Sequence, residues 1–237
     1  MPTHMNLVSL IDHAILHPTA TDEDLVRECA LAAELGVASV CVKPYMVARA
    51  SALLSESNVA VGTVIGFPQG GNLTEVKVAE ASLACEQGAI ELDMVINIAK
   101  ALEEDWDYIS TDIQEVLNIA LKHNAILKVI FETDYITSIT AKQKLCEICS
   151  QLGVGFVKTS TGFGYTKQAS GDYNYQGATL DDIKLMTEHT TNNVAVKASG
   201  GIRTKSAAQA MVDAGASRLG TSASQAIADD EPSSVGY

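Results

Sequence analysis

Short runs of β-branched and apolar residues alternate with longer amphipathic stretches along the whole chain. This pattern predicts eight strands, over residues 8–12, 39–44, 59–66, 90–97, 126–132, 155–160, 194–200 and 217–222. Their centres recur at intervals of roughly 30 residues, the length of one strand-and-helix unit. Such alternation is typical of a parallel sheet covered by helices.

The amphipathic stretches between the strands predict helices. Residues 22–36 carry apolar side chains at helical spacing, and residues 207–216 show the same spacing. Thr21 or Asp22 is a suitable N-cap for the first of these helices. Gly36 is suited to its C-terminal end, because glycine readily adopts the left-handed conformation that closes many helices.

Eight such units without a linker or a shift in composition predict a single-domain TIM (β/α)8 barrel that spans residues 1–237. The alternative architecture is a doubly wound open sheet. That fold usually has a glycine-rich fingerprint after its first strand, whereas residues 12–20 (DHAILHPTA) contain no glycine. The barrel is therefore the favoured interpretation.

Composition narrows the classes of function. Apolar residues make up 47% of the chain and charged residues 19%, which excludes a disordered protein. The formal net charge of −13 argues against a nucleic-acid or membrane-surface partner. No apolar run approaches the roughly 20 residues of a membrane span, and the first residues do not resemble a secretory signal.

The five cysteines favour a cytoplasmic protein with reduced thiols, because an odd number is scattered over a long chain. Cys146 and Cys149 form a C-x-x-C pair. They lie among apolar residues at helical spacing, so we interpret them as helix cysteines rather than a redox motif.

Strand parity predicts charged side chains inside the barrel. Successive strand residues point to opposite faces, and the apolar set of each strand is expected to face the helices. The remaining set includes Asp93, Lys158 and Lys197. Both lysines are near the C-terminal ends of neighbouring strands, where barrel active sites are built. Burial and mutual repulsion would lower a lysine pKa and yield a free amine for Schiff-base chemistry, with Asp93 as a proton carrier.

Lys128 shares this inward face but has a simpler interpretation. A buried ammonium is costly unless it is paired, and Glu91 or Glu132 has the parity to pair with it. We therefore interpret Lys128 as part of a salt bridge that stabilises the barrel.

A phosphate site is predicted after the last two strands. The segment SGGIR contains Gly200, Gly201 and Arg203, and GTSAS contains Gly220 and Ser222 ahead of a short helix. Loops in these two places form the recurrent phosphate site of TIM barrels. Glycine lets backbone N–H groups approach an anion, and the serine and arginine side chains add donors. Local donors of this kind would hold an anionic substrate despite the acidic net charge.

Several segments resemble the deoxyribose-phosphate aldolase family, in the family's order and over nearly the whole chain. They are DHAILHP (12–18), TVIGFPQG (63–70), TEVKVAEA (74–81), ELDMVIN (91–97), DWDYISTDI (105–113), LKVIFET (127–133), VKTSTGFG (157–164), VKASGGIR (196–203) and GTSA (220–223). VKTSTGFG and VKASGGIR together are highly specific. The resemblance implies a TIM barrel and a class I aldolase that needs neither metal nor cofactor.

By the same resemblance, the reaction is the reversible cleavage of 2-deoxy-D-ribose 5-phosphate to D-glyceraldehyde 3-phosphate and acetaldehyde, in deoxyribose phosphate catabolism. The motifs place the Schiff-base lysine at Lys158, the second lysine at Lys197 and the acid/base aspartate at Asp93. Gly162 of VKTSTGFG is a predicted substrate contact. A homo-oligomer, dimer or tetramer, is expected, with no nucleic-acid or membrane partner.

Two further residues are assigned to the site. Asp12 matches the family's DH motif, at the predicted end of the first strand, and would hold Lys197 or a substrate hydroxyl. Cys41 would line the pocket, although an inert buried thiol is an equally good interpretation.

Three features depart from the family pattern. Ala14 stands where the family usually has threonine after DH, so one pocket hydroxyl is missing. The loop over 165–179 is about ten residues longer than the family norm and is a candidate lid, subunit contact or tolerated insertion. The C-terminal tail, 229–237, is expected to be flexible, and its Tyr237 is either a proton carrier or without function.

Competing functions use the same scaffold. A sugar-phosphate isomerase would work by enolisation with a Glu/His pair and would not need two inward lysines. A non-enzymatic phosphosugar-binding barrel would not need to retain Asp93, Lys158 and Lys197 together. An aldolase acting on a different acceptor remains open, because of Ala14 and the long loop.

Overall fold

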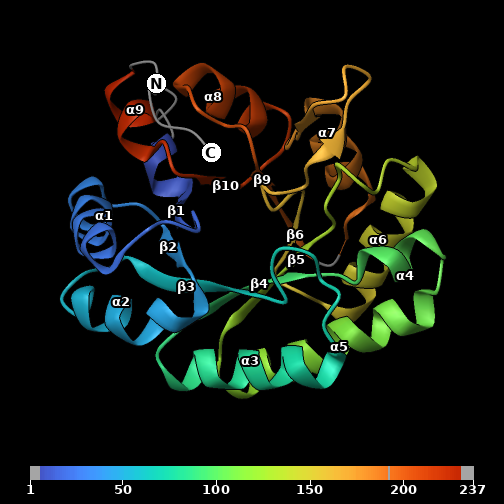
Figure 1. The fold of residues 1–237 in the computed structure, drawn as a ribbon, viewed down its shortest axis with the longest axis horizontal. Helices are drawn as coiled ribbons and strands as arrows, with labels where there is room; N and C mark the ends of the chain where they lie inside the picture. Colours follow the sequence, from blue (N-terminus) through green and yellow to red (C-terminus); the bar gives the residue numbers. More distant parts are fainter. Residues whose placement is uncertain (1–5, 192, 231–237) are drawn as a thin grey trace.

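The computed structural model describes residues 6–191 and 193–230, and its central feature is a closed barrel of eight parallel strands (Figure 1). In order around the barrel, these are β1 (Ile11–Ile15), β10 (Arg218–Thr221), β9 (Ala195–Ser199), β6 (Phe156–Lys158), β5 (Ile126–Ile130), β4 (Glu91–Val95), β3 (Ala60–Ile65) and β2 (Ser39–Val42). The predicted TIM barrel is therefore confirmed, and the doubly wound alternative is wrong.

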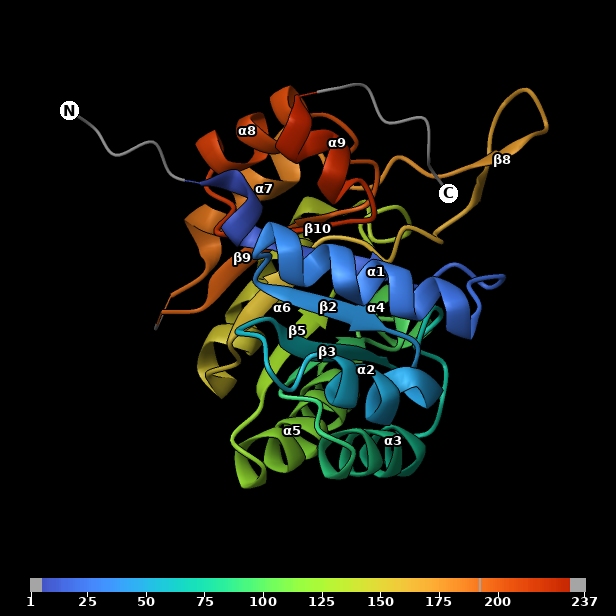
Figure 2. The same cartoon turned by 90° about the vertical axis from the view of Figure 1, so that its left-hand side faces the viewer.

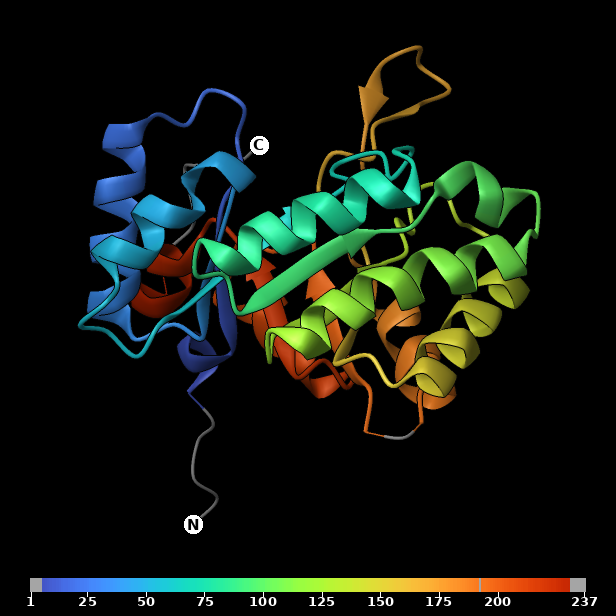
Figure 3. The same cartoon turned by 90° about the horizontal axis from the view of Figure 1, so that it is seen from below.

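Helices surround the barrel and connect its strands (Figures 1 and 3). They are α1 (Asp22–Leu35), α2 (Val47–Leu53), α3 (Thr74–Glu86), α4 (Ile98–Leu102), α5 (Trp106–Lys122), α6 (Ile139–Leu152), α7 (Leu180–His189), α8 (Lys205–Asp213) and α9 (Ser224–Asp229). Helices α3 and α5 lie side by side (Figure 3). In the described part of the chain, no helix is both long and apolar enough to cross a membrane.

Helix α1 begins and ends where the sequence predicts. The Thr21 side chain accepts a hydrogen bond from the Asp24 backbone N–H, and the Asp24 carboxylate accepts one from the Thr21 N–H, which completes a capping box. Gly36 closes the helix with φ +65°, a conformation that glycine adopts without strain. Cys146 and Cys149 lie in α6, so the prediction of helix cysteines is confirmed. Both are buried, and burial raises the pKa of Cys146 to about 12.

The first strand differs from its prediction. Residues Leu7–Leu10 form one turn of 3-10 helix, and the strand begins only at Ile11. The side chain of Asn6 accepts a hydrogen bond from the Val8 N–H and so favours a turn over an extended start. Asp12 consequently is the second residue of β1, deep in the barrel, rather than its last residue.

The main apolar core lies between the strands and the helices. Leu92 and Met94 of β4 and Leu127 and Val129 of β5 are at most 1% exposed and belong to this core. The alternate residues of the same strands include Glu91, Asp93 and Lys128, which are buried and face the barrel interior, as the strand parity predicts. The barrel therefore has an apolar outer layer that holds the fold and a charged interior.

The long loop over 165–179 folds as a small β-hairpin with strands β7 (Thr166–Lys167) and β8 (Tyr173–Asn174). Figure 2 shows this hairpin projecting from the body of the barrel. It connects β6 to α7, so it rises from the end of the barrel at which the strands terminate.

Candidate active site

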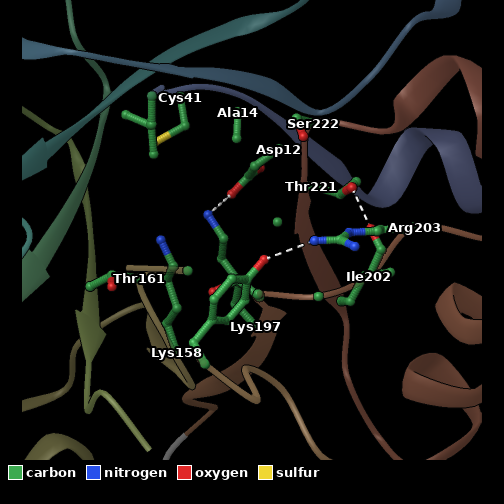
Figure 4. Close-up of a pocket in the computed structure, with 17 residues that line it drawn as sticks. Asp12, Ala14, Cys41, Lys158, Thr161, Lys197, Ile202, Arg203, Thr221 and Ser222 are labelled. Atoms are coloured by element: carbon green, nitrogen blue, oxygen red, sulfur yellow. Dashed lines mark hydrogen bonds and ion pairs between the residues drawn. The ribbon is translucent and has the colours of Figure 1, made fainter. Parts of the chain in front are cut away.

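Strands β6 and β9 place two lysines side by side. Lys158 and Lys197 are register partners in this parallel pair, so their side chains stand on the same face. Both line one pocket, and Figure 4 shows them entering it together, with Cys41 and Ala14 across from them. The sequence prediction that these two lysines face the interior is confirmed.

Asp93 of β4 joins the two lysines. Its Oδ2 accepts hydrogen bonds from Lys158 Nζ and from Lys197 Nζ, each at 2.7 Å. Asp93 is fully buried beneath the pocket, whereas both lysines reach its lining. One carboxylate oxygen therefore lies within proton-transfer distance of both amines.

A second layer of charges lies beneath this triad. Lys128 Nζ is 2.6 Å from Asp12 Oδ2, 2.6 Å from Glu91 Oε2 and 3.2 Å from Asp93 Oδ1. Arg218 Nη1 lies 2.6 Å from Asp12 and 3.0 Å from Glu91. The predicted pairing of Lys128 with Glu91 is confirmed, and Asp12 joins it as a further partner.

The alternative partner for Lys128, Glu132, lies elsewhere. Glu132 follows the end of β5 with φ +57°, which turns it off the face that strand parity assigns to it. Its carboxylate instead accepts hydrogen bonds from the backbone N–H and the hydroxyl of Thr161. Desolvation raises the pKa of Glu132 to about 7, with the neighbouring Asp134 adding to the rise.

The balance of charge in the barrel interior favours a neutral Lys158. The interior cluster holds four cationic side chains (Lys128, Lys158, Lys197, Arg218) and three carboxylates (Asp12, Glu91, Asp93). It is balanced when one lysine is neutral. Burial lowers the pKa of Lys158. Asp93 raises this pKa and the positive charge of Lys197 lowers it, and the net effect is a lowered pKa. By contrast, its carboxylate partners hold the pKa of Lys128 well above the usual value, despite the opposing effect of burial.

Asp93 stays ionised in this setting. Burial alone would raise its pKa, but Lys128, Lys158 and Lys197 outweigh desolvation and hold the pKa well below the usual value. The site therefore pairs a carboxylate that can accept a proton with a lysine that can be a neutral amine.

Asp12 also lines the pocket. Its carboxylate accepts hydrogen bonds from Lys197, Lys128, Arg218 and the Ser39 hydroxyl. Of the two roles predicted for Asp12, the contact with Lys197 is the one observed. It holds the Lys197 ammonium beside Lys158.

The predicted phosphate residues lie together at one side of the same pocket. Gly200, Gly201, Arg203, Gly220 and Ser222 all contribute to its lining, and Figure 4 shows Arg203 and Ser222 on this flank. The loops are tied by a hydrogen bond of 2.6 Å from the Thr221 hydroxyl to the Ile202 carbonyl.

Glycine is required here for two reasons. Gly200 and Gly201 have φ values of +91° and +77°, which favour glycine. At Gly220, a Cβ would lie 3.1 Å from Lys197 Cε and 2.7 Å from the Ser199 Cβ. The absence of a side chain at Gly220 thus gives Lys197 its path into the pocket.

The rest of the pocket is partly apolar. Cys41, Ala14 and Leu16 line it, as does Gly162. Burial raises the pKa of Cys41 to about 11, so its thiol is protonated near neutral pH, which fits the inert interpretation. Tyr237 and the rest of 231–237 lie outside the described residues.

Three pocket features were not assigned from the sequence. Thr161 and Tyr175 line the pocket, the latter from the inserted hairpin, and Arg218 anchors the charges below it. Arg218 could have been predicted, because it is two residues from Gly220 on the same strand and so faces the barrel interior with it. The position of Tyr175 could not, because strand parity and helical periodicity do not specify the course of a long loop.

Within residues 6–191 and 193–230, no group of three or more His, Cys, Asp or Glu side chains is arranged to hold a metal ion.

Comparison with known proteins agrees with this geometry. Residues 7–227 match the model of the DeoC/LacD aldolase family. The chain belongs to this family. A deoxyribose-phosphate aldolase of Thermococcus gammatolerans is 47% identical over 227 residues, which cover 95% of this chain and 96% of that protein.

Solved structures of DeoC/LacD-type aldolases share the fold. A crystal structure described as a putative deoxyribose-phosphate aldolase from Coccidioides immitis superposes with a TM-score of 0.86 at 39% identity, covering 94% of this chain and 84% of that one. A deoxyribose phosphate aldolase from Aeropyrum pernix, described as having a unique tetrameric structure, superposes with a TM-score of 0.83 at 29% identity, covering 94% and 89%. The family resemblance seen in the sequence motifs is confirmed.

Proposed function

We propose that this chain is a class I deoxyribose-phosphate aldolase that reversibly cleaves 2-deoxy-D-ribose 5-phosphate to D-glyceraldehyde 3-phosphate and acetaldehyde. The observation that carries the proposal is the position of Lys158, which reaches the pocket with a lowered pKa and a carboxylate at 2.7 Å. A neutral amine beside a proton acceptor is the arrangement that Schiff-base formation requires. The names of the similar proteins support the choice of substrate.

The reaction begins at the aldehyde carbon of the open-chain sugar. The neutral Nζ of Lys158 attacks C1, and the resulting alkoxide takes up a proton to give a carbinolamine. Loss of the C1 hydroxyl as water then forms a protonated imine. Asp93 carries protons for these steps between Lys158 and Lys197, since its Oδ2 contacts both amines.

Carbon–carbon cleavage follows. A base, Asp93 acting through a water molecule, removes the proton of the C3 hydroxyl. The C2–C3 electron pair moves into the imine, so that an enamine remains on Lys158 and C3 becomes the aldehyde of glyceraldehyde 3-phosphate. Protonation of the enamine at C2 and hydrolysis of the imine release acetaldehyde and regenerate the lysine.

The phosphate end of the substrate fixes its direction in the pocket. Gly200, Gly201 and Ser222 would bind the phosphate through N–H and hydroxyl donors, with Arg203 supplying a positive charge. The sugar would then extend from this flank toward Lys158, across the same pocket. Contacts at both the phosphate end and the aldehyde end of the substrate would position C1 for attack.

The enolising isomerase is less well supported. Such an enzyme would use a Glu/His pair, yet the described residues that line the pocket include neither glutamate nor histidine. They include two lysines instead. Asp12, the carboxylate in that lining, is already paired with Lys128, Lys197 and Arg218.

The proposal is tested by turnover. The protein is incubated with 2-deoxyribose 5-phosphate in EDTA, and release of glyceraldehyde 3-phosphate is followed through a coupled dehydrogenase. The proposal is supported if the wild-type protein releases glyceraldehyde 3-phosphate and the Lys158→Met variant does not. No release of glyceraldehyde 3-phosphate by the wild-type protein, or undiminished release by Lys158→Met, would contradict it.

We also infer that residues 1–237 form one domain and that the chain assembles with copies of itself. The tetrameric Aeropyrum pernix relative supports the assembly. Exposed apolar side chains offer contact surface, among them Leu83 in α3, Leu121 in α5 and Leu73, the N-cap residue of α3. Light scattering after gel filtration tests this inference, since a monomer mass would contradict it.

All five cysteines are unpaired, which supports a cytoplasmic location.

A further inference from the structure

The inserted hairpin returns directly onto the phosphate flank of the pocket. Gly177, just after strand β8, lies so close to Gly200 that a Cβ at Gly177 would be 2.5 Å from the Gly200 carbonyl oxygen. The Ala178 N–H donates to this same carbonyl at 3.1 Å. The end of the hairpin is thus joined to the loop that would hold the phosphate.

A carboxylate fixes the hairpin from the other side. Asp134 accepts hydrogen bonds from the backbone N–H groups of Gln176, at 2.5 Å, and Gly177, at 3.1 Å. The hydroxyl of Tyr135 donates to the Tyr165 carbonyl at 3.0 Å, at the start of the hairpin. Both ends of the hairpin are therefore anchored to the loop that follows β5, although its tip projects away (Figure 2).

Between these anchors, Tyr175 enters the active-site pocket. Its hydroxyl accepts a hydrogen bond from Nη2 of Arg203 at 3.3 Å, and its ring meets the ring of Tyr165 edge to face at 5.4 Å between centroids. A dashed line in Figure 4 runs from Arg203 to this hydroxyl. The ring packing limits the rotation of Tyr175 and so fixes where its hydroxyl lies.

We propose that Tyr175 is a specificity residue that directs Arg203 toward the substrate phosphate, so that the insertion strengthens selection for phosphorylated sugars. This inference rests on the proposed function. Arg203 is itself exposed, and each hydrogen bond that it makes narrows the many rotamers open to a long guanidinium side chain on a surface loop. Tyr175 supplies one such bond next to Gly200 and Gly201. The chemistry selected for is a phosphate monoester at the end of the substrate remote from the reacting carbonyl.

The proposal predicts a split between binding and chemistry in Tyr175→Phe, which keeps the ring and removes the hydroxyl. KM for 2-deoxyribose 5-phosphate is expected to rise about fivefold, the value of one ordinary hydrogen bond, with kcat within twofold of wild type. KM for unphosphorylated 2-deoxyribose should not move, because that sugar has no phosphate for Arg203 to meet. Tyr173→Phe is the matched control, an exposed tyrosine in the same hairpin, and should leave both constants unchanged.

A second variant separates positioning from general damage to the loop. In an Arg203→Met background, Tyr175→Phe should raise KM for the phosphorylated sugar no further, since the group that it positions is gone. Equal KM increases for the phosphorylated and unphosphorylated sugars in Tyr175→Phe would overturn the proposal. So would an additional fivefold increase in the Arg203→Met background.

Direct binding keeps this test separate from that of the proposed function. Inorganic phosphate is titrated into wild-type, Tyr175→Phe and Tyr173→Phe protein by calorimetry. Weaker phosphate binding in Tyr175→Phe alone supports the role of Tyr175 even if the wild-type protein cleaves no deoxyribose phosphate, a result that would refute only the proposed function. Equal phosphate affinity in all three proteins overturns the inference, whatever the turnover.

Discussion

The chemistry of the pocket depends on which of its lysines is neutral. Lys158 and Lys197 share the Oδ2 atom of Asp93, but Lys197 also contacts Asp12, whereas Asp93 is the one ion-pair partner of Lys158 among the described residues. Burial and the adjacent ammonium lower the pKa of Lys158. These surroundings support our proposal that Lys158 is the amine that attacks a carbonyl.

Replacing Lys158 by methionine should remove catalysis without unfolding the barrel. The three remaining cationic side chains of the cluster still face three carboxylates, so no buried charge is left unbalanced. We expect kcat/KM for aldol cleavage to fall by roughly 10⁴-fold or more. Circular dichroism should match that of the wild type, and an unfolded variant would contradict the balance described here.

The role of Lys197 is tested by the pH profile. In Lys197→Leu the nearby positive charge is gone, so the pKa of Lys158 should rise and the acidic limb of the kcat/KM profile should move up by roughly one pH unit. Lys197→Arg keeps the charge and should leave this limb near its wild-type position. An unshifted limb in Lys197→Leu would remove Lys197 from the control of Lys158.

At the scale of elements, the segments after the strands are less predictable than the strands themselves. Capping residues and apolar spacing locate α1 to the residue, because the signals are local. The start of β1 is misplaced because Asn6 favours a turn there, and Glu132 leaves its predicted face because its backbone adopts φ +57°. The hairpin at 165–179 depends on distant contacts to Asp134, which sequence periodicity does not encode.

Glu132, in the loop that follows β5, makes the stability of the folded protein depend on pH. Its pKa in the folded protein is raised to about 7, so the native state holds a proton that the unfolded chain releases at lower pH. The free energy of unfolding should therefore fall as pH rises from about 4.5 to 7, by an amount on the order of 3 kcal/mol. Urea unfolding should show this loss in the wild type and less of it in Glu132→Gln. Glu115→Gln, on the exposed face of α5, is the control and should keep the wild-type slope.

At the scale of the molecule, the barrel interior is held by charges rather than by apolar packing alone. Lys128 lies 2.6 Å from both Asp12 and Glu91 and is 1% exposed, so its removal would leave buried carboxylates short of a partner. Strand parity predicts which side chains enter this interior. It does not predict their pairing, because the partners come from strands far apart in the sequence, such as β1 and β10.

Lys128→Met should therefore destabilise the whole barrel. We expect the free energy of unfolding to fall by about 3–5 kcal/mol, the usual cost of breaking a buried ion pair from one side. Lys144→Met, which removes an exposed partner of Glu147, should cost less than about 1 kcal/mol. Equal losses in the two variants would mean that the interior charges contribute no more than a surface pair.

The central claim, that Lys158 forms a covalent imine with the substrate, is tested most directly by borohydride trapping. The protein is reduced in the presence of 2-deoxyribose 5-phosphate, digested and mapped by mass spectrometry. The account predicts one reduced adduct, on Lys158, with loss of activity in proportion to labelling. An adduct on Lys197 instead, or no adduct during active turnover, would contradict it.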